Sequence, residues 1–156
     1  MIEINNIDLF DSNCDGYCHQ VNGFGVWGAG LAKEMKKRFP RSFLVDSMTL
    51  VRDKRKLGTF NYSAPANDTD KWIFNVCGQF NYGTDKQYTD YSALNFAFES
   101  LKDFLLKMEI KDVFVLGIPH GLGSGLGGGD FTKVLSILNY HFKDCEKIKL
   151  LICKKE

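Results

Sequence analysis

The sequence predicts one α/β domain, spanning residues 1–156, in which helices cover both faces of a mixed sheet. Short apolar runs of strand length alternate with amphipathic helical patterns through most of the chain, without internal repeats, low-complexity segments or a linker. Two glycine-rich turns, residues 23–30 and 121–129, each follow a predicted strand and precede a predicted helix. Ligands of α/β folds bind where such strand ends meet, so we expect the functional site between these two turns.

Six segments have the length and apolar content of β-strands. The run over residues 112–118 is apolar enough to be buried on both faces of a sheet. The predicted strands are residues 2–5, 17–22, 57–62, 72–77, 112–118 and 148–153.

Four segments have helical periodicity. The first places Leu31 and Met35 on one face and ends before Pro40, and the second covers residues 42–54. Thr89 or Asp90 caps the third, the longest, and a fourth begins at Asp130. The apolar stripe of the third helix consists of Leu94, Phe98, Leu101, Leu105 and Met108.

Composition excludes several classes of protein. The net charge of +1 gives no strong footprint for nucleic acid or an anionic membrane. No apolar run approaches the ~18 residues of a membrane span, and the N-terminus lacks a signal-peptide pattern, so we expect a cytoplasmic protein. The five cysteines include no CxxC pair and indicate reduced thiols. Cys14, Cys18 and His19 match no zinc spacing, and we expect neither a metal nor a cofactor.

The second glycine-rich turn, residues 121–129, is the strongest candidate for ligand binding. It holds six glycines between a buried strand and a helix start, where backbone N–H groups and the helix dipole attract anions. Gly123 to Gly128 fit G-x-G-x-x-G, but only one strand follows, so a dinucleotide-binding fold is excluded. No Lys-Ser or Lys-Thr follows, which excludes a Walker A loop. The alternative is a plain flexible loop.

Polar residues before the first glycine-rich turn are candidates for chemistry. His19 is either a satisfied structural histidine or a catalytic group, and Asn22 is either a turn former or a ligand for sugar hydroxyls. Trp27 either fills the core or closes over a ligand. For Asp130 a helix-capping role is favoured over a chemical one.

The two glycine-rich turns together resemble the ligand loops of one known family. His19-Gln20-Val21-Asn22 with Gly28-Ala29-Gly30-Leu31-Ala32, and later Ile118-Pro119 with Gly123-Ser124-Gly125-Leu126, closely resemble the two ligand loops of macrodomains. Asp8-Leu9-Phe10 fits the early Gly-Asp-Ile/Leu motif, with Ile7 where glycine is usual. The resemblance covers nearly the whole chain. It is greatest to the phage-type and bacterial branch of small ADP-ribose 1''-phosphate phosphatases and terminal ADP-ribose hydrolases.

The resemblance implies a three-layer α/β/α sandwich with a mixed central sheet that binds ADP-ribose or a derivative, with ADP-ribosylated macromolecules as further partners. It assigns Asp8 to the adenine amino group, Asn22 to the distal ribose, the first turn to that ribose and its phosphate, and the second turn to the diphosphate. The substrate-binding residues implied are Asp8, Leu9, Asn22, Trp27, Gly28, Ala29, Gly30, Leu31, Pro119, Gly123, Ser124, Gly125, Leu126 and Gly127.

The resemblance also implies a choice of mechanism. Relatives that remove ADP-ribose from protein acids use a lysine after the fourth-strand region and an aspartate in the second loop, where this chain has Gln79 and Gly127. Lys86 lies seven residues beyond Gln79. His19 matches a histidine of the phosphatase members. The leading hypothesis is therefore removal of the terminal phosphate of ADP-ribose 1''-phosphate, with His19 and Asn22 as catalytic residues. The alternatives are removal of ADP-ribose from protein or nucleic acid, and a non-catalytic ADP-ribose reader.

Overall fold

A computed structural model describes residues 1–110 and 112–155 of the chain. Its sheet has six strands in the order β1-β6-β5-β2-β4-β3. Neighbouring strands are parallel except β3, which runs antiparallel to β4 at one edge. The strands are β1 (Ile2–Asn5), β2 (Gly16–Asn22), β3 (Phe60–Ser63), β4 (Trp72–Gln79), β5 (Phe114–Pro119) and β6 (Ile148–Cys153). The predicted mixed sheet is confirmed.

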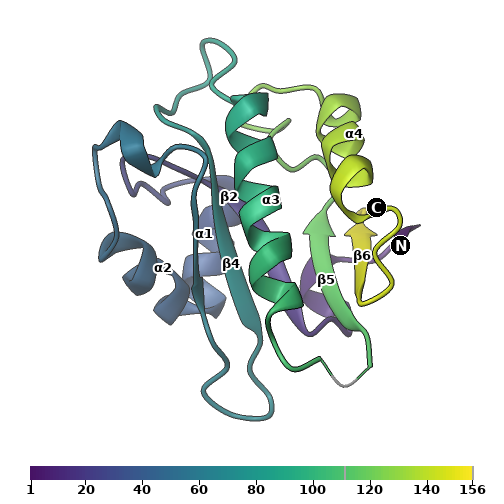
Figure 1. Cartoon of the computed structure of the whole chain (residues 1–156). Coiled ribbons are helices and arrows are strands. Elements are labelled where there is room, and N and C mark those ends of the chain that lie inside the picture. Colours follow the sequence, from purple (N-terminus) through teal and green to yellow (C-terminus); the bar gives the residue numbers. More distant parts are fainter. Residues whose placement is uncertain (111, 156) are drawn as a thin grey trace.

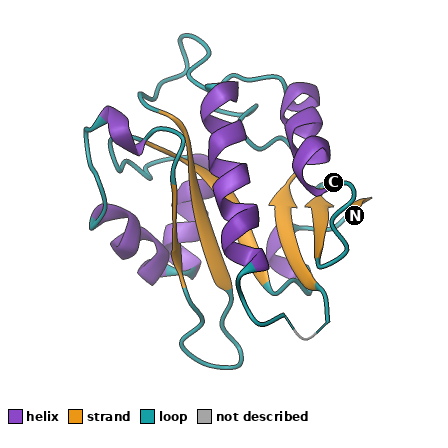
Figure 2. Cartoon of the chain, in the orientation of Figure 1, coloured by secondary structure: helices purple, strands orange, loops and turns teal. Residues whose placement is uncertain are grey.

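Helices cover both faces of this sheet. The α-helices are α1 (Gly30–Arg38), α2 (Pro40–Ser47), α3 (Tyr91–Leu106) and α4 (Phe131–Phe142), with 3-10 turns η1 (Leu9–Asp11) and η2 (Lys54–Lys56). Figures 1 and 2 show α3 and α4 in front of the sheet and α1 behind it. The α3–α4 side and the α1 side each contain a separate apolar cluster. The fold is therefore the predicted three-layer α/β/α sandwich.

Helix α3 forms because its apolar stripe and its cap agree. Leu94, Phe98 and Leu101 are fully buried against the sheet, and burying side chains of this size contributes about 1.5–3 kcal/mol each. The Asp90 carboxylate accepts a hydrogen bond from the Ala93 amide at 3.0 Å, so the predicted cap is confirmed. The helix ends at Leu106, short of the last predicted stripe residue, Met108, which still packs against the core.

The prediction of one helix over residues 42–54 is wrong. Helix α2 begins at Pro40, whose fixed φ suits a first helical turn, and it ends at Ser47. The Thr49 hydroxyl donates to the Asp46 carbonyl and helps close the last turn. Arg52 then adopts φ +57 and donates its amide to the Gly23 carbonyl at 2.7 Å. This bond ties residues 48–53 to the first glycine-rich turn.

The bounds of four strands also differ from the prediction: β2 begins one residue earlier, at Gly16, and β5 spans Phe114–Pro119 rather than residues 112–118. Strand β3 starts at Phe60 rather than at residue 57, because η2 and a turn at Gly58 (φ +84) precede it. Strand β4 continues to Gln79, two residues past the predicted end, and so carries Gln79 to the edge where the glycine-rich turns lie. None of the described helices has the length and apolar character needed to cross a membrane.

Candidate functional site

A cleft of about 510 Å³ lies where the carboxyl ends of β2, β4 and β5 meet the two glycine-rich turns. Its volume falls in the range of small-molecule sites. Figure 1 shows the strand arrowheads of β5 and β6 pointing to the edge from which these loops leave. Among the described residues, no Asp, Glu, Lys or Arg side chain lines the cleft. Polar and glycine residues that line it include His19, Gln20, Asn22, Gln79, Thr84, His120 and Gly127.

Asn22 shapes the first glycine-rich turn. Its Oδ1 accepts hydrogen bonds from the Phe24 and Val26 amides, both at 3.1 Å, and its Nδ2 donates to the Val26 carbonyl at 2.7 Å. A carboxamide has two N–H donors, so one remains for a ligand. Asn22 is therefore a turn former with one N–H to spare, and it lines the cleft.

The N-terminus of α1 faces the cleft without a side-chain cap. Ala29 is the N-cap residue and makes no side-chain hydrogen bond, while Gly28, Gly30 and Leu31 line the cleft. The first backbone N–H groups of a helix lack intrahelical partners, and the helix dipole adds partial positive charge there. The N-terminus of α4 differs, because the Asp130 carboxylate caps it by accepting from the Thr132 amide at 2.9 Å. Asp130 thus has the predicted capping role.

The second glycine-rich turn curls through internal hydrogen bonds. The Gly128 amide donates to the Gly125 carbonyl at 3.0 Å, and the Gly129 amide donates to the Gly123 carbonyl at 2.9 Å. Gly123 has φ +75, which favours glycine. Within the described chain, the amides of Gly125, Leu126 and Gly127 donate to no protein acceptor, and all three residues line the cleft. Consecutive free N–H groups of this kind bind anions.

His19 lines the cleft but is only 1% exposed. Its Nε2 lies 2.7 Å from Asn75 Oδ1, and Asn75 Nδ2 already donates to the Ser42 carbonyl and to Asn61 Oδ1. Asn75 Oδ1 is therefore an acceptor, and His19 Nε2 carries the proton. The other nitrogen, Nδ1, is buried and has no partner among the described residues. Burial lowers the pKa of His19 to about 4, so the ring is neutral at pH 7.

Trp27 fills the core, the first of its two alternatives. It is 4% exposed, its ring packs edge-to-face with the His19 ring with centroids 4.7 Å apart, and its Nε1 donates to Asp46 Oδ2 at 3.0 Å. Asp46 also pairs with Lys56 at 2.8 Å, and both of these side chains are buried. The first glycine-rich turn is thus anchored beneath by a polar network.

Four residues of the predicted set lie outside the cleft lining: Asp8, Leu9, Trp27 and Ser124. Asp8 caps η1 by accepting from the Phe10 amide at 3.0 Å and pairs with Lys155 at 3.1 Å; the Phe10 hydrogen bond, foremost, holds the pKa of Asp8 below its usual range. Leu9 is buried in the core on the α1 side. The Ser124 hydroxyl donates to the Gly121 carbonyl at 2.7 Å. Their roles toward adenine or phosphate remain predictions.

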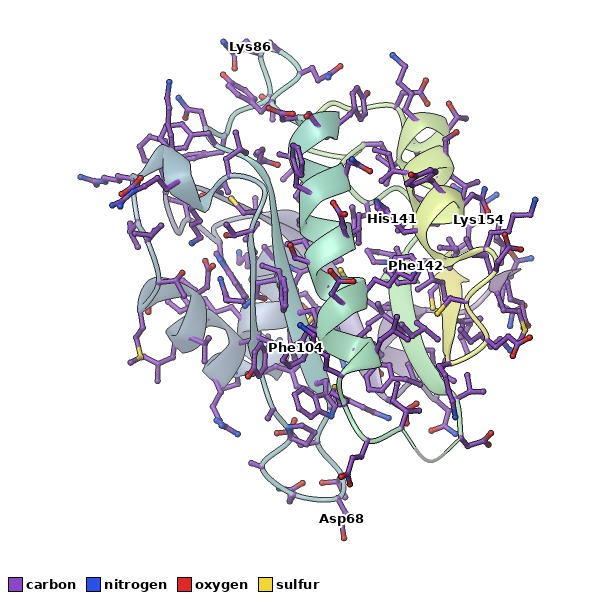
Figure 3. The ribbon with its side chains drawn as sticks, viewed as in Figure 1. Asp68, Lys86, Phe104, His141, Phe142 and Lys154 are labelled. Carbon is purple, nitrogen blue, oxygen red and sulfur yellow. The ribbon has the colours of Figure 1, made fainter. Side chains whose placement is uncertain are left out.

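The sequence argument missed a cluster of two carboxamides and a hydroxyl. Gln20 Nε2 donates to Gln79 Oε1 at 2.6 Å and to Thr89 Oγ1 at 3.0 Å. A Cβ at Gly127 would lie 3.0 Å from both Gln20 Nε2 and Gln79 Oε1 and would clash with Thr89 Oγ1. The cluster therefore fills the space that a side chain at position 127 needs. Lys86, by contrast, is exposed at the outer tip of the loop after β4 (Figure 3).

The structure has the macrodomain fold. It matches the macrodomain of Mycobacterium tuberculosis DarG with a TM-score of 0.77 at 20% identity, over 100% of this chain and 98% of that one. It matches Thermosipho africanus DarTG, solved in complex with ADP-ribose, with a TM-score of 0.76 at 20% identity, over 97% of this chain and 41% of that one. A macrodomain of Oceanobacillus iheyensis, solved with ADP, gives 0.67 at 11% identity, over 99% and 83%.

Sequence comparison finds distant relatives, although no family model matches the chain. A DNA ADP-ribosyl glycohydrolase of Thermus aquaticus is 26% identical over 128 residues, covering 81% of this chain and 34% of that protein. That of Mycobacterium tuberculosis is 26% identical over 153 residues, covering 97% and 42%. The chain thus spans less than half of these enzymes. An uncharacterized 17.5 kDa protein of phage T4 is 29% identical over 130 residues, covering 82% and 80%.

Proposed function

We propose that this protein binds ADP-ribose in the cleft and hydrolyses an ADP-ribosyl linkage to a nucleic acid strand. One observation carries the proposal. Among the described residues, two sets of backbone N–H groups without protein acceptors, one at the start of α1 and one in the second glycine-rich turn, face the same cleft, which has no Asp, Glu, Lys or Arg in its lining. Two such anion sites on neighbouring strand ends suit a diphosphate. The sequence relatives named as DNA ADP-ribosyl glycohydrolases support hydrolysis.

The mouth of the cleft supports a nucleic acid carrier. Phe24 packs on Phe80 and Tyr82, with ring centroids 5.0 and 6.0 Å apart, and Tyr82 lines the cleft and is 48% exposed. Lys54 lies over the Phe80 ring at 5.7 Å, and Arg52 is bonded to the first glycine-rich turn through its amide. Exposed aromatic rings beside cations form the usual binding surface for single strands.

We name these five residues, Phe24, Arg52, Lys54, Phe80 and Tyr82, the aromatic–basic rim. Neither Arg52 nor Lys54 forms an ion pair within the described residues, and both side chains are exposed. The net charge of +1 for the whole chain therefore conceals a local basic surface beside the cleft.

The phosphatase hypothesis loses its main support. It relied on His19 as general acid or base, and that ring is buried, neutral and bonded through its only proton to Asn75. A general acid must carry a transferable proton within reach of the leaving group, and a general base must reach the attacking water, whereas His19 Nδ1 is buried. The geometry of His19 weighs against such a transfer and suits a structural residue.

Three assays test the proposed function. Calorimetric titration with ADP-ribose should give saturable binding at one site. An ADP-ribosylated single-stranded oligonucleotide should release free ADP-ribose, and ADP-ribose 1''-phosphate should release no phosphate above the rate of a His19→Ala variant. Binding without any turnover would identify a reader instead. Turnover of ADP-ribosylated protein but not of the oligonucleotide would reassign the carrier, and absence of binding would refute the proposal.

A further inference from the structure

Gln79 is the polar side chain that lies beside Asn22 at the carboxyl end of β4. The two residues are register partners between β2 and β4, next to an irregularity in the pairing at Val21 and Asn22. Both line the cleft, as do Gly30 of the first turn and Gly127 of the second. Gln79 therefore lies beside Asn22 at the edge of the sheet where the two glycine-rich turns converge.

The hydrogen bonds around Gln79 fix the orientation of its carboxamide. Its Nε2 donates to the Asn81 carbonyl at 2.9 Å, an acceptor that cannot donate in return. Its Oε1 must then be the atom facing Gln20 Nε2 at 2.6 Å. Thr89 Oγ1 donates to the Gly123 carbonyl at 2.6 Å and therefore also accepts from Gln20. All the hydrogen bonds in the cluster therefore agree with one assignment of the amide nitrogen and oxygen atoms of Gln20 and Gln79.

This arrangement leaves Gln79 with unused capacity. A carboxamide offers two N–H donors and two acceptor lone pairs, so one N–H and one lone pair remain. Gln20 Oε1 is a buried acceptor with no partner among the described residues, although Gln20 lines the cleft. A buried acceptor without a donor is destabilising unless a ligand satisfies it. Gln79 itself thus keeps one donor and one acceptor for a bound molecule.

Within the described part of the chain, no lysine, arginine or carboxylate of the cleft lining is available for the role that we assign to Gln79. The cleft lining holds no Lys or Arg within the described residues, and Gly127 has no room for a carboxylate because of Gln20, Gln79 and Thr89. Gln79 is therefore among the side chains of the cleft that can donate to the developing charge on a departing group. An N–H aimed at such a charge in a site with little water is an effective stabiliser.

We propose that Gln79 is a catalytic residue, whose free N–H binds the carbonyl oxygen of the group leaving the distal ribose. This assignment rests on the proposed function, with the distal ribose at Asn22. Water attacks C1'' of the ribose as the bond from C1'' to the base nitrogen breaks. The electron pair of that bond moves onto the nitrogen and its neighbouring carbonyl oxygen, where Gln79 donates. The proton lost by the water ends on the base, giving free ADP-ribose and the unmodified base.

The test compares Gln79→Leu with the wild type on two substrates. One is an oligonucleotide ADP-ribosylated on a base, and the other is ADP-ribose linked to 4-nitrophenol, a leaving group that needs little stabilisation. We expect kcat on the oligonucleotide to fall roughly 10²- to 10³-fold, the usual loss for one such donor, and much less on the nitrophenyl substrate. ADP-ribose affinity and Tm should stay close to those of the wild type.

Asn139→Leu is the matched control, since it removes an exposed carboxamide from α4, away from the cleft. Gln79→Glu is a second variant of nearly equal shape; it keeps the acceptor for Gln20 and removes the donor, so it should be as slow as Gln79→Leu. Equal losses on both substrates, or wild-type turnover in either Gln79 variant, would overturn the assignment and leave the proposed function standing. Absence of wild-type turnover on both substrates would overturn both proposals.

Discussion

Lys56 Nζ lies 2.8 Å from Asp46 Oδ1 beneath the first glycine-rich turn, with both side chains buried. The second oxygen of Asp46 accepts from Trp27, and Asn61 Nδ2 donates to Oδ1 at 2.8 Å. The chain of hydrogen bonds continues through Asn61 toward His19. One polar network therefore connects the indole of Trp27 in the first glycine-rich turn, Asp46 on α2 and His19 on the central strand β2. Because the backbone of the turn provides the cleft, the network is a support for the site.

Removing one partner of this ion pair should unfold the protein at lower denaturant concentration. Lys56→Met leaves the Asp46 carboxylate buried without its cation, and breaking such a pair costs about 3–5 kcal/mol. Urea denaturation measures the loss. Arg38→Met is the control, since its pair with Glu34 is exposed on α1 and contributes about 0.5 kcal/mol or less. Equal shifts in the two variants would contradict a special role for the buried pair.

Acid should destabilise the protein through His19. The folded pKa of about 4 lies below the ordinary value of about 6.5, so the unfolded chain binds a proton that the folded chain refuses. The contribution is complete above pH 6.5 and is lost as pH falls toward 4, by up to about 3 kcal/mol. His19→Gln should flatten the dependence of unfolding free energy on pH across this window. The same slope in wild type and variant would show that other groups cause it.

Local sequence patterns were sufficient for most of the fold. The bounds of β1 and β6 were predicted correctly, because β1 alternates apolar and polar residues and β6 is an apolar run between lysines. The end of α2 was not predicted, because it depends on Arg52 at φ +57 reaching the Gly23 carbonyl, a contact between segments far apart in the chain.

The site was predicted in its backbone and less well in its side chains. Glycine density placed both turns correctly, since the need for positive φ and open N–H groups is local. The burial of His19 depends on Asn75 from another strand. The sequence placed Gln79 at the position of the relatives' lysine, but its bonds to Gln20 and its place at the end of β4 became visible only in the structure.

Two glycines of the second turn should respond differently to added side chains. A Cβ at Gly125 meets no protein atom within 4 Å, whereas one at Gly127 clashes with Thr89. Gly125→Val should therefore keep the wild-type Tm and weaken ADP-ribose binding, because the new methyl groups enter the cleft. Gly127→Ala should lower Tm, because overpacking costs about 1–3 kcal/mol of the free energy of unfolding. Calorimetry and thermal melting separate the two effects. Unchanged affinity in Gly125→Val would place the diphosphate elsewhere.

The aromatic–basic rim should bind the carrier strand and leave ADP-ribose affinity unaffected. Tyr82→Ala removes an exposed ring at the mouth of the cleft, and loss of one stacked base costs about 1–3 kcal/mol. Affinity for an ADP-ribosylated oligonucleotide should fall about tenfold or more. Tyr140→Ala is the matched control, because Tyr140 is 83% exposed on α4 and does not line the cleft.

A charge variant tests the same rim independently. Replacing Lys54 by serine removes one cation beside the Phe80 ring, so the salt dependence of oligonucleotide binding should become shallower by about 0.7 in log–log slope for a single strand. Binding of free ADP-ribose, which does not depend on this cation, provides the internal reference. A parallel loss of affinity for ADP-ribose and oligonucleotide would mean that Lys54 acts on the cleft itself. An unchanged slope with full oligonucleotide affinity would place the strand on another surface.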